Sequence, residues 1–249
     1  MSKKVMIVTG GSRGIGAEIA KLGALDGYAV CISYLRNKAA ADAVVEGITQ
    51  AGGEAIAIVA DMAVESDILH LFQTVDQKFG TLTALVNNAG ILEKQMRVDQ
   101  MDAARMQRIF TTNILGSFLC AREAVKRMST LHGGSGGAIV NISSVAARAG
   151  GPGEYVDYAA SKGAIDTFTI GLAKEVATEG IRVNAVRPGV IYTEIHASGG
   201  EPGRVDRVKS NVPMQRGGEA NEVAQAVLWL LSDKASYTTG SLLDVTGGR

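Results

Sequence analysis

The chain has 249 residues, 46% of them hydrophobic and only 4 of them proline, which is enough to bury the core of one large domain. Its 25 lysine and arginine residues balance its 25 aspartate and glutamate residues, which excludes a broad electrostatic field that would recruit nucleic acid or an anionic membrane. Only four consecutive apolar residues follow Lys4, too few for a signal peptide or a membrane span, so we expect a cytoplasmic location.

Seven short apolar runs along the chain have the composition of β-strands. They occupy residues 4–8, 28–34 and 54–60, and further runs begin near residues 82, 137, 181 and 241. Several are almost continuously apolar, as is typical of strands covered on both faces. Between them, residues such as Ile15, Ile19 and Leu22 share one helical face. This alternation predicts the α/β fold class, with a doubly wound, seven-stranded parallel sheet in a single domain of residues 1–249.

The first predicted strand runs into the glycine-rich turn "TGGSRGIG", which precedes an amphipathic helix. Gly10, Gly14 and Gly16 allow backbone N–H groups to converge at the helix N-terminus, where the helix dipole favours a pyrophosphate. The spacing GxxxGxG differs from the GxGxxG of the usual dinucleotide fingerprint. A dinucleotide site is therefore one interpretation, and a purely structural turn is the other.

The second predicted strand ends in "SYLRNK", with Arg36 about 20 residues beyond the glycine turn. Dinucleotide-binding folds usually place a carboxylate there for the ribose 2′-hydroxyl, but residues 29–40 contain no acid. Arg13, inside the turn, is a second nearby cation. Two guanidinium groups can bind a 2′-phosphate through charge-assisted hydrogen bonds, so the sequence favours NADP(H) over NAD(H). The alternative is that both arginines are solvated surface residues.

The segment of residues 193–218 interrupts the alternation of strands and helices. It is rich in glycine, proline and charged residues, which predicts a small mobile lid within the domain.

Further motifs, in this order and at these separations, resemble those of the short-chain dehydrogenases/reductases. The motifs are "TGGSRGIG", Asp61 after the third predicted strand, "NNAG" at 87–90, Asn113, "NISS" at 141–144, "YAASK" at 158–162 and "RPG" at 187–189. The resemblance runs from Lys4 to the last residue. It implies a Rossmann-type fold and an oxidoreductase that interconverts a carbonyl and a secondary alcohol by hydride transfer. The chain is similar to the 3-oxoacyl-carrier-protein reductases and the glucose 1-dehydrogenases of the family.

The resemblance also implies a catalytic tetrad of Asn113, Ser144, Tyr158 and Lys162. Tyr158 would act as general acid and base on the reacting oxygen, and Ser144 would donate a hydrogen bond to that oxygen. Asn113 would hold a water that relays protons to Lys162, and Lys162 would contact the nicotinamide ribose.

Tyr158 and Lys162 lie four residues apart, so on a helix their side chains are neighbours. A lysine charge about 6 Å from the phenol, at an effective dielectric constant near 20, would favour the phenolate by roughly 2 to 3 kcal/mol. We therefore expect the pKa of Tyr158 to be lowered by about two units, which would make it a usable proton donor near neutral pH.

The cofactor contacts implied by the resemblance follow the chain. Besides Tyr158, Lys162, Arg36 and the three glycines, they are Ser12, Arg13 and Ile15 at the phosphates, Asp61 and Met62 at the adenine, Asn88, Ala89 and Gly90 along the ribose, and Pro188, Gly189, Ile191 and Thr193 at the carboxamide. No metal site is expected.

Three assignments have alternatives. Ser143 could replace Ser144, although we expect a backbone-bonding role for it. Tyr155 has alanine rather than lysine four residues on, which favours Tyr158. Asn113 could be a helix-breaking residue that satisfies local backbone groups.

Substrate selection is expected from the lid and from residues 148–155. The lid carries charges of both signs, which favours a small polar carbonyl, hydroxy acid or sugar over a steroid. His196 could bond a hydroxylated or anionic substrate, and Tyr155 could recognise a substrate or simply pack.

Other functions and partners remain open. A reductase of acyl-carrier-protein thioesters needs a basic docking surface; Glu179 opposes it, whereas Lys126 and Arg127 could serve. A non-catalytic NADP(H) redox sensor is less favoured, because it would not need the proton donor. The resemblance implies a homotetramer assembled through helices of residues 103–129 and 155–178.

Overall fold

A computed structural model describes residues 3–249, and its framework is one seven-stranded sheet. Every neighbouring pair of strands is parallel, in the order β3-β2-β1-β4-β5-β6-β7. The strands are β1 Lys4–Val8, β2 Tyr28–Tyr34, β3 Glu54–Val59, β4 Ala84–Asn87, β5 Gly137–Ile142, β6 Ile181–Pro188 and β7 Leu242–Val245. The predicted fold class and strand count are confirmed.

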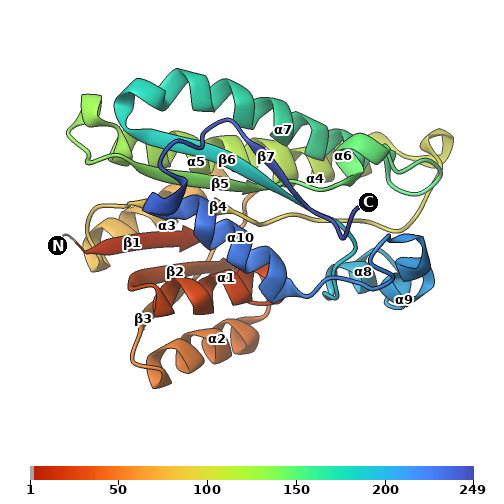
Figure 1. Ribbon diagram of the computed structural model, residues 1–249, viewed down its shortest axis with the longest axis horizontal. Coiled ribbons are helices and arrows are strands. Elements are labelled where there is room, and N and C mark those ends of the chain that lie inside the picture. The colour runs from red at the N-terminus through yellow and green to blue at the C-terminus, as the bar shows by residue number, and fades with distance from the viewer. Residues whose placement is uncertain (1–2) are drawn as a thin grey trace.

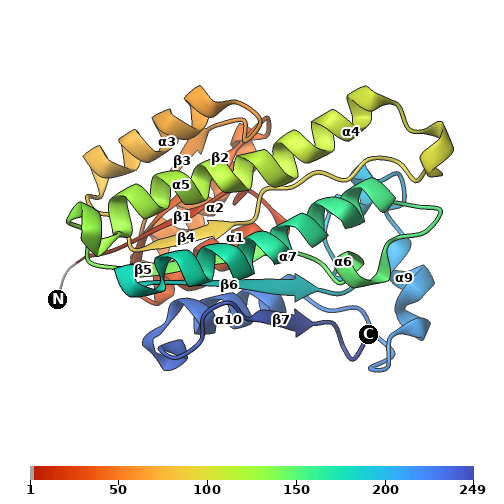
Figure 2. The same cartoon turned by 90° about the horizontal axis from the view of Figure 1, so that it is seen from above.

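Helices cover both faces of the sheet (Figure 1). One layer holds α1 Gly14–Leu25, α2 Lys38–Gln50 and α10 Ala220–Leu231, and the other holds α3 Glu65–Lys78, α4 Ala103–Phe110, α5 Gly116–Met128 and α7 Val156–Val176. Figure 2 looks onto the layer of α3, α5 and α7. Three short helices are α6 Ala146–Ala149, α8 Ile195–Ser198 and α9 Arg204–Val208. No helix within residues 3–249 combines the length and apolar character needed to cross a membrane.

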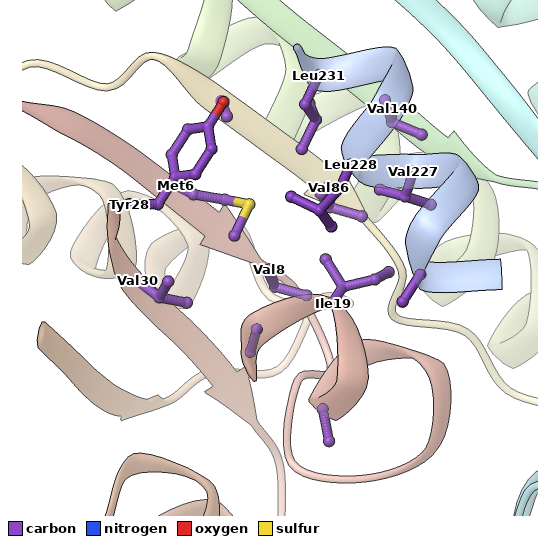
Figure 3. Close-up of a cluster of buried hydrophobic side chains, with 14 of the residues drawn as sticks. Met6, Val8, Ile19, Tyr28, Val30, Val86, Val140, Val227, Leu228 and Leu231 are labelled. Carbon is purple, nitrogen blue, oxygen red and sulfur yellow. The ribbon is translucent and has the colours of Figure 1, made fainter. Parts of the chain in front are cut away.

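The core between the sheet and the α1 and α10 layer is formed by side chains from both (Figure 3). Met6 of β1, Ile19 of α1 and Val227 of α10 are fully buried in it. Contact is close because Gly23 has no side chain: a Cβ there would lie 2.1 Å from Cε of Met6. The almost continuous apolar runs are thus explained by burial on both faces.

The two long helices expected at residues 103–129 and 155–178 are present, but the first is interrupted. A turn of π-helix, Thr111–Leu115, joins α4 to α5 and contains the buried Asn113. Such turns often occur at functional sites, and the sequence analysis did not predict this one.

The strand order reverses between β1 and β4, which places a crevice at the carboxyl ends of the strands. Figure 1 shows α8 and α9 at this edge, near the C-terminus. The expected lid of residues 193–218 holds both of these helices, and a bridge between Ile191 and Gly218 closes its base. Its mobility remains a prediction.

Candidate active site

The crevice is a cleft of about 1010 Å³ between the glycine turn, the strand ends, α7 and the lid. Nineteen predicted site residues line it: Gly10, Ser12, Arg13, Gly14, Ile15, Gly16, Arg36, Asp61, Met62, Asn88, Ala89, Gly90, Ser144, Tyr158, Lys162, Pro188, Gly189, Ile191 and Thr193. Asn113 is not among the lining residues and is buried, with 1% of its surface exposed. Residues that are far apart in the sequence are therefore brought together as predicted.

The glycine turn is held by contacts that exclude side chains. A Cβ at Gly16 would lie 2.5 Å from Nδ2 of Asn88 and one at Gly11 would lie 2.6 Å from Cγ2 of Ile32. Gly10 and Gly14 have positive φ angles of 63° and 53°, a region that glycine adopts without strain. The backbone therefore borders the cleft directly, which fits a pyrophosphate at the N-terminus of α1.

Asn88 supports this turn as well as lining the cleft. Its Nδ2 donates to the carbonyl oxygens of Thr9 (2.9 Å) and Gly10 (3.0 Å). Both hydrogens of Nδ2 are thus used by the turn, so a contact of this side chain with the ribose would have to be accepted by Oδ1.

Arg13 and Arg36 are exposed at the cleft, and neither forms an ion pair with a carboxylate within residues 3–249. Both guanidinium groups are thus available to an anion, which fits a ribose 2′-phosphate better than a hydroxyl. Asp61 also lines the cleft; its Oδ1 accepts from the backbone N of Ala63 at 2.8 Å.

Ser144, rather than Ser143, lies close enough to Tyr158 to lower the pKa of the phenol. The Ser143 hydroxyl is buried and donates to the carbonyl oxygen of Lys162 at 3.2 Å, a backbone-bonding role as expected. Ser144 and Tyr158 are 14 residues apart in the sequence, and the loop between β5 and α7 brings them close together.

Lys162 and Asn113 meet beside Gly90, where a Cβ would lie 3.5 Å from Nζ of Lys162 and 3.4 Å from Oδ1 of Asn113. Nζ of Lys162 donates to the carbonyl oxygen of Ile142 at 2.7 Å. Asn113 bonds both backbone groups of Ile91, accepting at 2.8 Å and donating at 3.1 Å. Asn113 therefore bonds the backbone of a residue 22 positions away rather than the local backbone groups considered as its alternative, and its relay role remains a prediction.

The expectation that Lys162 lowers the pKa of Tyr158 is wrong for this structure. Burial raises the pKa of the Tyr158 phenol to about 12, and the nearby Ser144 hydroxyl opposes this only in part. Burial also lowers the pKa of Lys162 to about 8, although Asp166 opposes that shift. Nζ of Lys162 lies 5.6 Å from the centre of the Tyr158 ring. Both groups lose their contact with water in the fold, and this desolvation outweighs the Coulomb attraction between the lysine and the phenolate.

Comparisons with known proteins agree with this site. Residues 10–249 match the family described as enoyl-(acyl carrier protein) reductase. An uncharacterized oxidoreductase, YgfF, of Escherichia coli is 63% identical over 98% of this chain and 99% of its own length. Glucose 1-dehydrogenase 2 of Bacillus subtilis is 37% identical over 100% of this chain and 95% of its own. A short-chain dehydrogenase of Burkholderia cenocepacia in complex with NADP is 34% identical with a TM-score of 0.91, covering 99% and 98% of the two chains.

The chain belongs to the short-chain dehydrogenase/reductase family. It is therefore an oxidoreductase.

The basic residues considered for carrier-protein docking have partners in this dehydrogenase/reductase. Lys126 and Arg127 both pair with the buried Glu123, at 2.9 Å, and Arg127 also pairs with Asp76. Glu179 accepts a hydrogen bond from Ser129. Neither cation is free to meet an acidic surface without competition.

The sequence analysis missed Arg249 and Glu194, which line the cleft of this dehydrogenase/reductase. Arg249 follows β7, and the carboxyl end of every strand in a parallel sheet lies at the same edge. The topology could therefore have indicated Arg249. Glu194 adjoins Thr193, but nothing in the sequence showed which way its side chain points.

Proposed function

We propose that this short-chain dehydrogenase/reductase is an NADP(H)-dependent enzyme that interconverts a carbonyl and a secondary alcohol on a small polar substrate. The observation that carries the proposal is the convergence of Ser144, Tyr158 and Lys162 on one cleft, with Ser144 close to the Tyr158 phenol. A tyrosine hydroxyl beside a second hydroxyl and a buried ammonium suits proton transfer at a carbonyl oxygen.

The cofactor assignment rests on the glycine turn and on Arg13 and Arg36, which form no ion pair with the carboxylates of residues 3–249. The NADP in the related Burkholderia cenocepacia structure supports it. The nicotinamide dinucleotide, when bound, would supply or accept the hydride. Gly10, Gly14 and Gly16 would leave backbone N–H groups near its pyrophosphate, and the two arginines would bind its 2′-phosphate.

The side chains of the chain itself would handle the proton. With a pKa of about 12, Tyr158 keeps its proton at neutral pH and would donate it to the substrate oxygen during reduction. Ser144 would donate a hydrogen bond where negative charge develops on that oxygen. Lys162, still mostly charged below pH 8, would stabilise the phenolate left on Tyr158.

Two other functions are less well supported. A 3-oxoacyl-carrier-protein reductase is the second candidate, favoured by the family description and opposed by the paired Lys126 and Arg127. A non-catalytic redox sensor would not require the grouping of Ser144, Tyr158 and Lys162 around the cleft. We also propose a cytoplasmic homotetramer, whose contacts would lie on α4, α5 and α7.

The test combines cofactor titration with turnover. NADPH and NADH are titrated onto the wild type and onto Tyr158→Phe by fluorescence, and a carbonyl panel is then assayed with the preferred cofactor. We expect at least tenfold tighter NADPH binding in both proteins, about 1.4 kcal/mol. Tyr158→Phe should lose at least a hundredfold in kcat, because it removes only the transferable proton.

Different results would contradict the cofactor assignment and the proton-transfer role. Equal or tighter binding of NADH would overturn the roles of Arg13 and Arg36. Turnover that survives in Tyr158→Phe would overturn the proton-transfer role and leave the cofactor assignment standing.

A further inference from the structure

Two polar atoms at the lid end of the cleft have no hydrogen-bond partner within residues 3–249. They are the hydroxyl oxygen of Tyr155 and Nδ1 of His196, and both are covered by protein. Leaving such a group unpaired costs about 1 to 3 kcal/mol. Unpaired buried groups in a binding cleft call for an explanation, and a ligand that pairs with them is one.

Tyr155 and His196 reach this place from different elements. Tyr155 is the residue before α7, three positions ahead of Tyr158, and is 5% exposed. His196 lies on α8 of the lid, and both residues line the cleft. A Cβ at Gly199, which follows α8, would lie 3.1 Å from the Tyr155 hydroxyl and 3.4 Å from the carbonyl oxygen of His196. The tyrosine hydroxyl is therefore packed against the helix that carries the histidine.

The hydrogen-bonding character of each atom follows from its surroundings. Nε2 of His196 lies 3.0 Å from the carbonyl oxygen of Ile191, which can only accept, so Nε2 carries the proton. Burial lowers the pKa of His196, so the ring is neutral and Nδ1 is an acceptor. The Tyr155 hydroxyl can donate as well as accept.

We propose that Tyr155 and His196 bind a hydroxyl group of the substrate, on a carbon close to the reacting carbonyl. This rests on the proposed function and narrows its substrate class. A hydroxyl donates to Nδ1 of His196 while it accepts from Tyr155. A carboxylate has no hydrogen for Nδ1, and an ammonium has no lone pair for the tyrosine hydrogen.

The charges nearby also favour a neutral hydroxylated substrate over a hydroxy acid. The guanidinium of Arg204 lies 5.1 Å from the centre of the Tyr155 ring. It is already paired with Glu154 at 2.6 Å and with Glu201 at 3.2 Å. A substrate carboxylate would have to compete with these two carboxylates. Because both unpaired atoms are covered, the hydroxyl enters when α8 moves away from Tyr155.

The test compares 3-hydroxybutan-2-one with butan-2-one, which lacks only the hydroxyl. In the wild type, kcat/KM for reduction by NADPH should be at least tenfold higher for the hydroxyketone. Tyr155→Phe keeps the ring and should bring this ratio close to one through a raised KM for the hydroxyketone. His196→Leu should also bring the ratio close to one. His196→Asn keeps a hydrogen-bond acceptor near the position of Nδ1, so it should retain part of the preference for the hydroxyketone.

Tyr237→Phe is the matched control, because this tyrosine is fully exposed. A wild-type ratio near one, or a ratio unchanged by Tyr155→Phe, would overturn the proposal. If neither ketone is reduced, the proposed carbonyl chemistry fails for these ketones. The role of Tyr155 is then tested by binding: the dissociation constants of butane-2,3-diol and butan-2-ol are measured with the NADP⁺-saturated protein. The same tenfold preference, lost in Tyr155→Phe, supports that role, and its absence rejects it.

Discussion

Lys162 is a buried residue whose charged ammonium group has little contact with water. Burial lowers its pKa to about 8, from an ordinary value of 10.5. The charged form is thus less favourable in the folded than in the unfolded chain, which reduces stability below pH 8. As the pH rises from 8 to 10.5, the folded state has lost the proton that the unfolded state still binds, so this penalty disappears.

Replacing Lys162 with methionine should therefore change how stability depends on pH. The melting temperature of Lys162→Met, relative to wild type, should be highest below pH 8 and should fall steadily between pH 8 and 10.5. Thermal unfolding of both proteins over pH 6 to 10.5 measures this difference. The change with pH is the readout, because the lost hydrogen bond to Ile142 shifts all values equally. A difference that stays flat with pH would show that the lysine is not desolvated.

The residue assignments show the limit of reasoning from spacing. Ser144 was preferred to Ser143, and in the structure Ser144 lies close to the Tyr158 phenol whereas Ser143 donates to the backbone of Lys162. The pKa of Tyr158 was predicted in the wrong direction. A count of residues places two groups near each other, but it contains no information on how much water surrounds them.

At the scale of elements, α4 and the start of α7 are joined by a buried ion pair. Nε of Arg105 lies 2.7 Å from Oδ2 of Asp157, with side chains 4% and 2% exposed. Arg105 also donates to the carbonyl oxygen of Lys94 at 2.6 Å, and Oδ1 of Asp157 accepts from the backbone N of Tyr158 at 2.9 Å. The pair therefore connects the loop before α4 with the backbone of the proposed proton donor.

Removing one charge of this ion pair should lower the free energy of unfolding. Asp157→Asn should lower the free energy of unfolding by about 3 to 5 kcal/mol, because it leaves the Arg105 charge buried without its counter-ion. The double variant Arg105→Met with Asp157→Leu should be more stable than Asp157→Asn, since it buries no charge. Urea unfolding measures both, and Arg97→Ala, which breaks an exposed pair with Asp99, is the control. Equal losses in the single and double variants would contradict this account.

At the scale of the whole molecule, one face of the α4, α5 and α7 layer exposes large apolar side chains. Leu115 is 50% exposed and Phe118 is 42% exposed, and the Phe118 ring stacks on that of Phe168 with centres 3.7 Å apart. Phe110 and Ile170 are exposed by 36% and 37%. Exposed apolar groups gathered on one face are typical of a contact between subunits.

The double variant Leu115→Glu and Phe118→Glu should reduce the assembly from the proposed tetramer to smaller species, because the new charges would be buried at the contact. Size-exclusion chromatography with light scattering measures the mass. Leu131→Glu, at a site 76% exposed in the turn after α5, should leave the mass unchanged. A monomeric wild type, or a double variant of unaltered mass, would reject the homotetramer or this surface.

The framework of the fold follows from local features of the sequence. The apolar runs located β1, β2 and the other strands, and their alternation with helices fixed a parallel sheet whose strands end at one edge. These features are local, since side-chain periodicity and backbone sterics act within a few residues. The same edge then collected Gly10, Tyr158 and the other predicted residues of the cleft.

The partners of the polar groups at this edge depend on how distant segments pack together. This packing gave Lys126 and Arg127 carboxylate partners and turned the Asn113 side chain to the backbone of Ile91. Among residues 3–249 it left the Tyr155 hydroxyl and Nδ1 of His196 without a hydrogen-bond partner at the lid. Burial and pairing depend on contacts between distant segments, and the free energy of a charge depends on the water those contacts remove. The position of the candidate active site could therefore be predicted from the chain, whereas its electrostatics could not.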